Sequence, residues 1–136
     1  MNPWPFLGLC LVALTAVLGL VFLWYQPSAQ GLYPAAARAA IKTKHIHAVV
    51  DVRSDEEWRS GHYDGAFHVP IKQLVDRLPH VISDRSTTVL FYCRTGRRAA
   101  AAAAAAQELG YRTVYYLEGG DYADLEPRHP SGGAWY

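Results

Sequence analysis

Cysteine is scarce in this sequence, in which Cys10 and Cys93 are the two thiols among 136 residues. Cys10 belongs to an apolar segment near the start and Cys93 to the domain that follows, so no disulfide can form within the domain. The cysteine count therefore does not indicate a redox compartment, and a single thiol suits catalysis. The net charge is also low, at +1, which excludes a general electrostatic argument for a nucleic acid partner.

Clustered metal ligands are also missing from the sequence. The six histidines are scattered along the chain. His45 and His47 alternate on a predicted strand edge and form the best candidate pair, but no further ligands gather near them. We therefore expect solvated histidines at these positions and no metal site.

Charged residues are absent from residues 5–25, which form the longest apolar run of the chain. At ~1.5 Å per residue a helix of this length spans a bilayer core of about 30 Å. Trp4, Trp24 and Tyr25 stand at its two ends, as interfacial aromatic residues do. A cleaved signal peptide and a buried core helix are the alternatives, and the run is long for the former. We expect residues 1–25 to be a transmembrane anchor or a signal segment.

The composition changes after this segment. Residues 26–34 contain proline, serine and glycine and are typical of a linker, and residues 35–136 suit one small domain. The residues that follow the segment carry opposed signals for the side of the membrane on which the domain lies. Basic residues between positions 38 and 44 favour a cytoplasmic domain, whereas the uncharged stretch 26–37 favours the opposite side.

Strands and helices alternate along the predicted domain. The predicted strands, rich in β-branched and aromatic residues, are 47–52, 66–69, 88–92 and 113–117. The predicted helices are 35–42, a short helix opened by the capping box of Ser54 and Glu57, 71–78 and 97–109, with one helical turn at 121–125. Residues 79–86 are predicted as a loop. This order implies an α/β fold with a mainly parallel sheet flanked by helices.

A basic loop that begins at Cys93 separates the third predicted strand from the alanine-rich helix. The loop consists of Cys93, Arg94, Thr95, Gly96, Arg97 and Arg98. Its backbone N–H groups, the helix dipole and its three guanidinium groups all favour a thiolate, which is the nucleophilic form of cysteine. A buried structural cysteine is the alternative, but burying three nearby arginines would be costly. Ligands of parallel sheets also bind beyond the carboxyl ends of strands, where Cys93 lies.

A second motif lies upstream of this loop. Its elements are Asp51-Val52-Arg53, Glu57-Trp58, Gly61-His62, Gly65-Ala66 and Pro70. Together with the Cys93 loop and the downstream Gly119-Gly120, this motif resembles the rhodanese (sulfurtransferase) family over residues 46–125. The sequence also resembles small exported single-domain members of the phage-shock type, and this resemblance favours a periplasmic domain.

The resemblance implies a rhodanese-like fold and roles for several residues of the two motifs. Cys93 would be the catalytic nucleophile, and residues 94–98 would bind the substrate. Asp51, Arg53 and Glu57 would support the site, with Arg53 paired to Glu57. Without a metal or organic cofactor, the Cys93 thiolate would take the outer sulfur of thiosulfate and pass it to a thiol or to cyanide. A partner protein is a further possible sulfur acceptor.

Three alternative functions fit parts of the pattern. A rhodanese-related phosphatase or arsenate reductase would carry its arginine in a Cys-x5-Arg loop, but position 99 is alanine here. A catalytically silent binding module at the membrane is the second alternative, which the retained Cys93 disfavours. A sulfur carrier dedicated to one partner protein is the third, and it would need the same residues as the enzyme.

Overall fold

The computed structural model describes residues 12–21 and 29–126. Residues 12–21 form a helix with exposed apolar side chains. Across the described ranges, no helix has both the length and the apolar character needed to cross a membrane. The rest of the predicted segment 1–25, including Cys10, and the tail from residue 127 lie outside the described residues.

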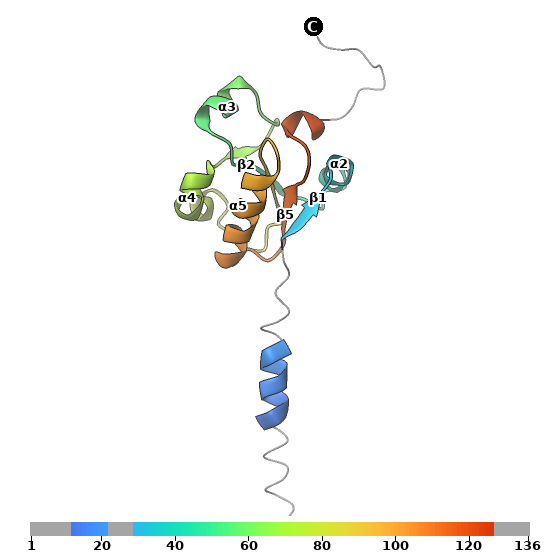
Figure 1. Ribbon diagram of the computed structural model, residues 1–136, viewed down its shortest axis with the longest axis vertical. Helices are drawn as coiled ribbons and strands as arrows, with labels where there is room; N and C mark the ends of the chain where they lie inside the picture. Colours follow the sequence, from blue (N-terminus) through green and yellow to red (C-terminus); the bar gives the residue numbers. More distant parts are fainter. Residues whose placement is uncertain (1–11, 22–28, 127–136) are drawn as a thin grey trace, which may run out of the picture.

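A five-stranded parallel sheet forms the centre of the described domain (Figure 1). In spatial order its strands are β1 (Gln30–Leu32), β5 (Val114–Leu117), β4 (Val89–Tyr92), β2 (Ala48–Asp51) and β3 (Phe67–His68). Every pairing is parallel, and Asp51 at the end of β2 lies opposite both Tyr92 and His68. The sheet confirms the predicted α/β fold and brings the carboxyl ends of three strands together.

Helices cover both faces of this sheet. They are α2 (Pro34–Lys42), α3 (Asp55–Ser60), α4 (Leu74–Val81) and α5 (Arg97–Glu108), with 3-10 turns η1 (Ile71–Gln73) and η2 (Tyr122–Asp124). Figure 1 shows α2 on one side of the strands and α4 and α5 on the other. Because side chains alternate along a strand, Phe91 and Cys93 contact the core below α4 and α5, whereas Leu90 and Tyr92 belong to the core below α2.

The alanine run explains how α5 lies close to the sheet. Ala99, Ala102, Ala103 and Ala106 are fully buried, and their small side chains let the helix backbone approach β4 and β5. The helix ends before Gly110, whose φ of +94° is accessible to glycine at little cost. This helix holds the Cys93 loop at its amino end.

Two predicted boundaries are wrong. The predicted linker 26–34 contains β1, because Gln30–Leu32 pair with β5 and form the edge strand of the sheet, and Pro34 begins α2. Edge pairing of backbone groups needs no periodic apolar pattern, so these three residues carry no strand signal. The predicted loop 79–86 is the second error, because α4 continues through Pro79 to Val81. Buried Leu74 and Leu78 hold that helix in place despite the hydrogen bond that proline removes.

Candidate active site

The Cys93 loop folds so that a backbone donor faces the thiol. Cys93 follows the last residue of β4 and is fully buried, and the backbone N–H of Gly96 donates to its Sγ at 3.1 Å. Gly96 has φ +88°, and a Cβ at this position would meet the carbonyl oxygen of Leu117 at 3.1 Å. The left-handed backbone at Gly96 and its close approach to β5 therefore explain why glycine occupies this position.

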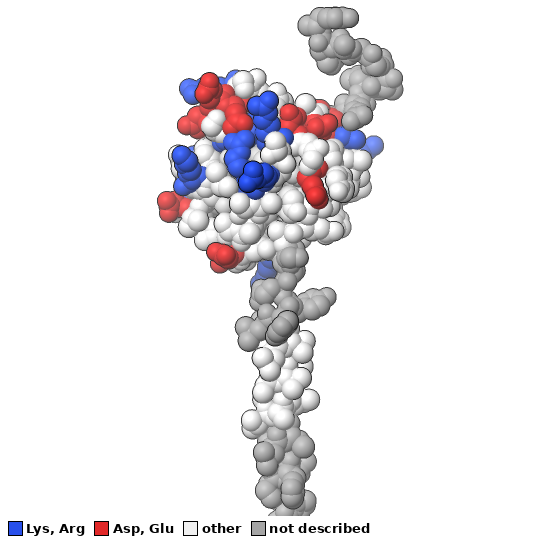
Figure 2. All heavy atoms as spheres, in the orientation of Figure 1, with Lys and Arg blue, Asp and Glu red and all other residues white. Residues whose placement is uncertain are grey.

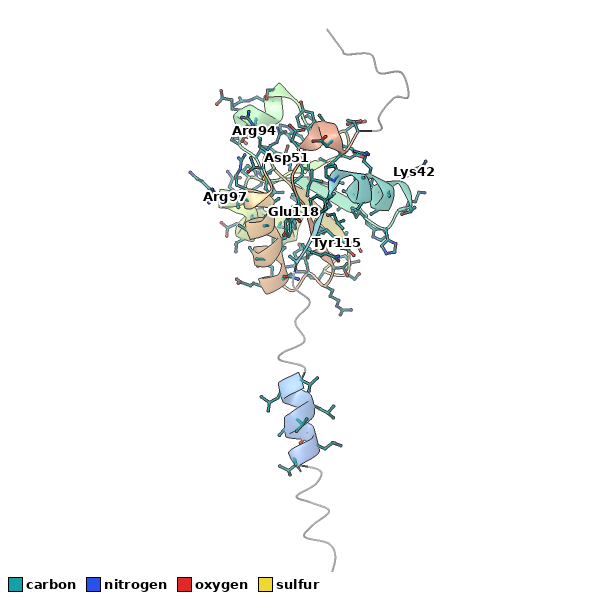
Figure 3. The ribbon with its side chains drawn as sticks, turned by 45° about the vertical axis from the view of Figure 1, so that its right-hand side comes forward. Lys42, Asp51, Arg94, Arg97, Tyr115 and Glu118 are labelled. Atoms are coloured by element: carbon teal, nitrogen blue, oxygen red, sulfur yellow. The ribbon has the colours of Figure 1, made fainter. Side chains whose placement is uncertain are left out.

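The three arginines of the loop have two different environments. Arg94 and Arg97 are exposed, and Figure 3 shows them on the same side of the molecule. In Figure 2 the basic side chains gather over the start of α5, beside the acidic side chains of α3. Arg98 is partly buried and pairs with Glu57 on α3. The loop therefore offers two exposed cations to an anionic substrate and one cation with a fixed partner.

The Glu57–Arg98 pair is bidentate. Arg98 Nη1 and Nη2 donate to the two Glu57 carboxylate oxygens at 2.7 and 2.9 Å. Hydrogen bonding from Arg98 lowers the pKa of Glu57 to about 2. The bond to Glu57 raises the pKa of Arg98, and the nearby Cys93 adds a smaller effect in the same direction. Arg98 thus links α3 to the cysteine loop as a permanent cation next to Cys93.

Glu57 reaches this position because of its place in the capping box. The Ser54 N–H donates to Glu57 Oε2 at 3.0 Å, and the Glu57 N–H donates to Ser54 Oγ at 3.2 Å. The predicted capping box is confirmed, whereas the predicted pairing of Glu57 with Arg53 is wrong. Arg53 instead points into the core and bonds to Asp51.

A buried ion pair closes the end of β2. Asp51 is fully buried and Arg53 is 6% exposed. Arg53 Nε and Nη2 donate to the Asp51 carboxylate at 2.7–3.0 Å, and Nη2 also donates to the Gly61 carbonyl at 2.6 Å. Burial alone would lower the pKa of Arg53, but hydrogen bonding and attraction to Asp51 raise it. A buried carboxylate requires such a partner, and this requirement explains why Arg53 turns inward.

Tyr92 is a supporting residue that the sequence analysis missed. Its hydroxyl donates to Asp51 Oδ2 at 2.7 Å and accepts from the Tyr63 N–H at 3.1 Å, and burial raises its pKa. The Arg53 guanidinium also lies 4.8 Å from the ring centre of Tyr122. The available signal was positional, because Asp51 lies next to the end of one predicted strand and Tyr92 ends another. Tyr92 directly precedes Cys93, so this network fixes the start of the loop.

Trp58 forms a ring stack beside this network instead of entering the main core. Its ring lies 3.5 Å from that of His62 and 4.6 Å from that of His68, with nearly parallel planes. His68 Nε2 is also within 3.1 Å of the Arg53 carbonyl oxygen, and His62 Nδ1 is within 3.0 Å of the Trp58 carbonyl oxygen. The stack holds the segment between α3 and β3 against the end of β2.

A pocket of about 320 Å³ opens next to Arg98. Residues 52–55, residues 70–73 and Arg98 line it. Arg98 is therefore common to the pocket and to the surroundings of Cys93. Within the described ranges, no three histidine, cysteine, aspartate or glutamate side chains are grouped closely enough to hold a metal ion.

Comparison with known proteins gives a family and several relatives. The family model of the rhodanese-like domain matches residues 33–123. Thiosulfate sulfurtransferase PspE of Escherichia coli K12 is 34% identical over 65 residues, which are 48% of this chain and 62% of PspE. A tRNA uridine(34) hydroxylase of Erwinia tasmaniensis is 33% identical over 101 residues, which are 71% of this chain and 29% of that protein.

Solved structures agree with this family. A human single-domain sulfurtransferase superposes with a TM-score of 0.59 at 25% identity, over 71% of this chain and 94% of the human one. The chain spans less than two thirds of the length of either curated relative. The family match covers most of the chain and contains both motifs, with Cys93 in the loop between β4 and α5. The chain therefore belongs to the family of rhodanese-like domains.

Proposed function

We propose that this protein is a thiosulfate sulfurtransferase that acts through a persulfide on Cys93. The observation that carries the proposal is the placement of this thiol, which receives the Gly96 N–H and lies beside the Arg98 cation. The exposed Arg94 and Arg97 provide charge for an anionic donor at the same loop. The likeness to PspE, named as a thiosulfate sulfurtransferase, supports the same choice of donor.

The reaction has two displacement steps. The Cys93 thiolate attacks the outer sulfur of thiosulfate, the sulfur–sulfur bond of thiosulfate breaks, and sulfite leaves with the bonding electron pair. The product is a Cys93 persulfide. An acceptor thiolate or cyanide then attacks the outer sulfur, and Cys93 leaves as the thiolate. The second step regenerates the Cys93 thiolate, so the protein has the same redox state before and after a full cycle.

The three arginines and Gly96 of the loop each have a physical task in this scheme. Arg94 and Arg97 pair with the sulfonate oxygens of the dianionic donor. The Gly96 N–H stabilises negative charge on the cysteine sulfur, and the paired Arg98 supplies positive charge at the same atom. Asp51, Arg53 and Tyr92 touch no reacting atom and position the end of β4.

The loop does not favour phosphate chemistry. In the related phosphatases an arginine closes the loop six positions after the cysteine, but here that position is Ala99, which is fully buried in α5. The arginine at position 98 is bound to Glu57. A phosphate would therefore find no arginine at the position from which those enzymes hold it.

We also propose that the segment 1–25 attaches the domain to the inner membrane or directs its export, with the domain in the periplasm. The uncharged run over residues 5–25 supports this, as do the exposed apolar side chains of 12–21, which a membrane would cover. A cytoplasmic domain on the same anchor is the alternative. A topology reporter fused after Tyr136 distinguishes the two orientations.

Steady-state turnover tests the proposed function. The full-length protein should convert thiosulfate and cyanide to thiocyanate and sulfite, and Cys93→Ser should abolish this without lowering the melting temperature by more than a few degrees. Release of phosphate from an aryl phosphate should be no faster than with Cys93→Ser. Folded protein without turnover would favour a binding module, and Cys93-dependent phosphate release would favour the phosphatase.

A further inference from the structure

The pocket beside Arg98 carries opposite charges that the donor reaction does not use. Lys72 lies in its lining and is exposed, and it forms no ion pair with any described residue. Asp55 also lines the pocket, and its carboxylate is 70% exposed. The carboxylate Oδ1 of Asp55 lies 3.7 Å from His68 Nδ1, whereas Arg59 Nε donates to the Asp55 backbone carbonyl at 3.1 Å. The pocket thus presents one available ammonium group and one available carboxylate.

We propose that this pocket binds the sulfur acceptor, and that the acceptor is a small thiol with both a carboxylate and an ammonium group. Lys72 holds its carboxylate, Asp55 holds its ammonium group, and its thiol is directed past Arg98 toward Cys93. The proposal rests on the proposed sulfurtransferase function and adds the class of acceptor. An amino-acid-type thiol such as cysteine has this charge pattern.

The charges distinguish the acceptor from the donor. Thiosulfate is a dianion without a positive group, so it can pair with Lys72 but not with Asp55, whereas a thiol with both charged groups pairs with both. Arg94 and Arg97 lie on the cysteine loop and are not part of the pocket lining, so they remain available to the donor. The volume of about 320 Å³ is at the lower end of the 300–1,000 Å³ that ligand pockets occupy. The pocket therefore suits a small polar molecule.

The position of Arg98 connects the pocket with the reacting sulfur. Cys93 Sγ is fully buried, but the outer sulfur of a persulfide extends ~2 Å beyond it. The acceptor thiol loses its proton to solvent, and its thiolate attacks this outer sulfur. The Cys93–sulfur bond breaks, and Cys93 departs as a thiolate beside the Arg98 cation. The acceptor leaves as a persulfide, so sulfur and electrons balance.

Four thiols that carry both charged groups, one of them or neither test the proposal: cysteine, 3-mercaptopropionate, cysteamine and 2-mercaptoethanol. A burst of sulfite from the full-length protein and thiosulfate is measured first. Steady-state sulfite release then gives kcat/KM for each thiol. The selectivity for a thiol is its kcat/KM divided by that of 2-mercaptoethanol on the same protein. The selectivity of a variant is then compared with that of the wild type, so that the intrinsic reactivity of each thiol cancels.

Each variant should remove one part of the selectivity. Lys72→Met should lower the selectivity for cysteine and 3-mercaptopropionate by about three- to tenfold, as expected for a partly exposed ion pair. Asp55→Asn should lower the selectivity for cysteine and cysteamine by a similar factor. The matched surface variants Lys42→Met and Glu108→Gln should change neither, and Figure 3 shows Lys42 on the opposite side from Arg94 and Arg97.

Two results would overturn the proposal in distinguishable ways. If the sulfite burst occurs and either selectivity survives the loss of its residue, the acceptor pocket is wrong and the proposed sulfur transfer stands. If no sulfite burst occurs, the proposed function itself fails, and the acceptor proposal fails with it.

Discussion

Replacing Glu57 by glutamine should separate the ion pair with Arg98 from the rest of the site. Glutamine keeps an oxygen that can accept from the Ser54 N–H, so the capping box can persist. The two short bonds from Arg98, at 2.7 and 2.9 Å, lose their charged acceptor. We therefore expect the variant to fold, to be less stable at neutral pH, and to hold Arg98 less firmly beside Cys93.

The magnitude follows from the pKa of Glu57. The fall in the pKa of Glu57 from 4.5 to about 2 corresponds at most to about 3–4 kcal/mol, at ~1.36 kcal/mol for each tenfold change in the acid constant. The two side chains are 29% and 37% exposed, and solvent screening reduces the contribution of such pairs. We expect Glu57→Gln to lower the free energy of unfolding by about 1–2 kcal/mol.

The pH dependence has a definite sign. Because the pKa of Glu57 is lower in the folded chain than in the unfolded chain, its stabilisation is complete above pH 4.5 and is lost as the pH falls toward 2. The difference between wild type and variant should be constant from neutral pH down to about pH 5. At pH 3 less than about half of it should remain.

Urea unfolding followed by circular dichroism, repeated between pH 7 and pH 3, measures this difference. Glu56→Gln is the matched control, because Glu56 is an exposed carboxylate in the same first turn of α3. Equal effects of the two variants would refute the role of Arg98 and leave only the helix dipole. A Glu57→Gln effect that stays undiminished down to pH 3 would refute the electrostatic explanation.

Four further substitutions test other parts of the site. Arg94→Ala and Arg97→Ala should each raise the KM for thiosulfate about three- to tenfold and change turnover of an uncharged persulfide donor much less. Arg112, an exposed arginine beyond the far end of α5, is the control. An equal effect of Arg112→Ala would refute a specific role of Arg94 and Arg97 in binding the donor. Gly96→Ala should cost about 1–3 kcal/mol of unfolding free energy and reduce sulfur transfer, because its φ is +88° and Leu117 leaves little room; wild-type stability and activity would contradict the assigned loop geometry. Tyr92→Phe should lower the free energy of unfolding by about 1–3 kcal/mol, because it removes a donor to buried Asp51. Tyr33→Phe, on an exposed side chain, should leave the free energy of unfolding almost unchanged. Equal losses of stability would show that the buried hydrogen bond contributes little.

Local features of this domain were predictable from the sequence. The strand at 88–92, the capping box at Ser54 and the alanine helix all depend on residues close together in the chain, and β4, α3 and α5 occupy those places. The position of Cys93 between β4 and α5 followed from the same local signals. Parallel order followed from the alternation of strands and helices.

Contacts between distant segments were less predictable. The sequence predicts that Arg53 pairs with Glu57, but Arg53 pairs with Asp51, because a buried carboxylate without a partner would be costly. Arg98 then takes Glu57, 41 positions earlier in the chain. The strand β1 was missed because pairing with β5 defines it, and its own side chains carry no pattern. These ion pairs and this strand pairing depend on which groups become buried when the domain folds. The spacing of residues along the chain does not reveal that burial.

The central claim is that Cys93 carries the transferred sulfur, and mass spectrometry of the protein after reaction with thiosulfate tests it most directly. The account predicts one added sulfur atom on the peptide that contains Cys93, with one sulfite released per chain, and loss of the added sulfur when cyanide is supplied. Cys93→Ser should show neither change. An unmodified Cys93 in folded protein, or sulfur bound elsewhere on the chain, would contradict the account.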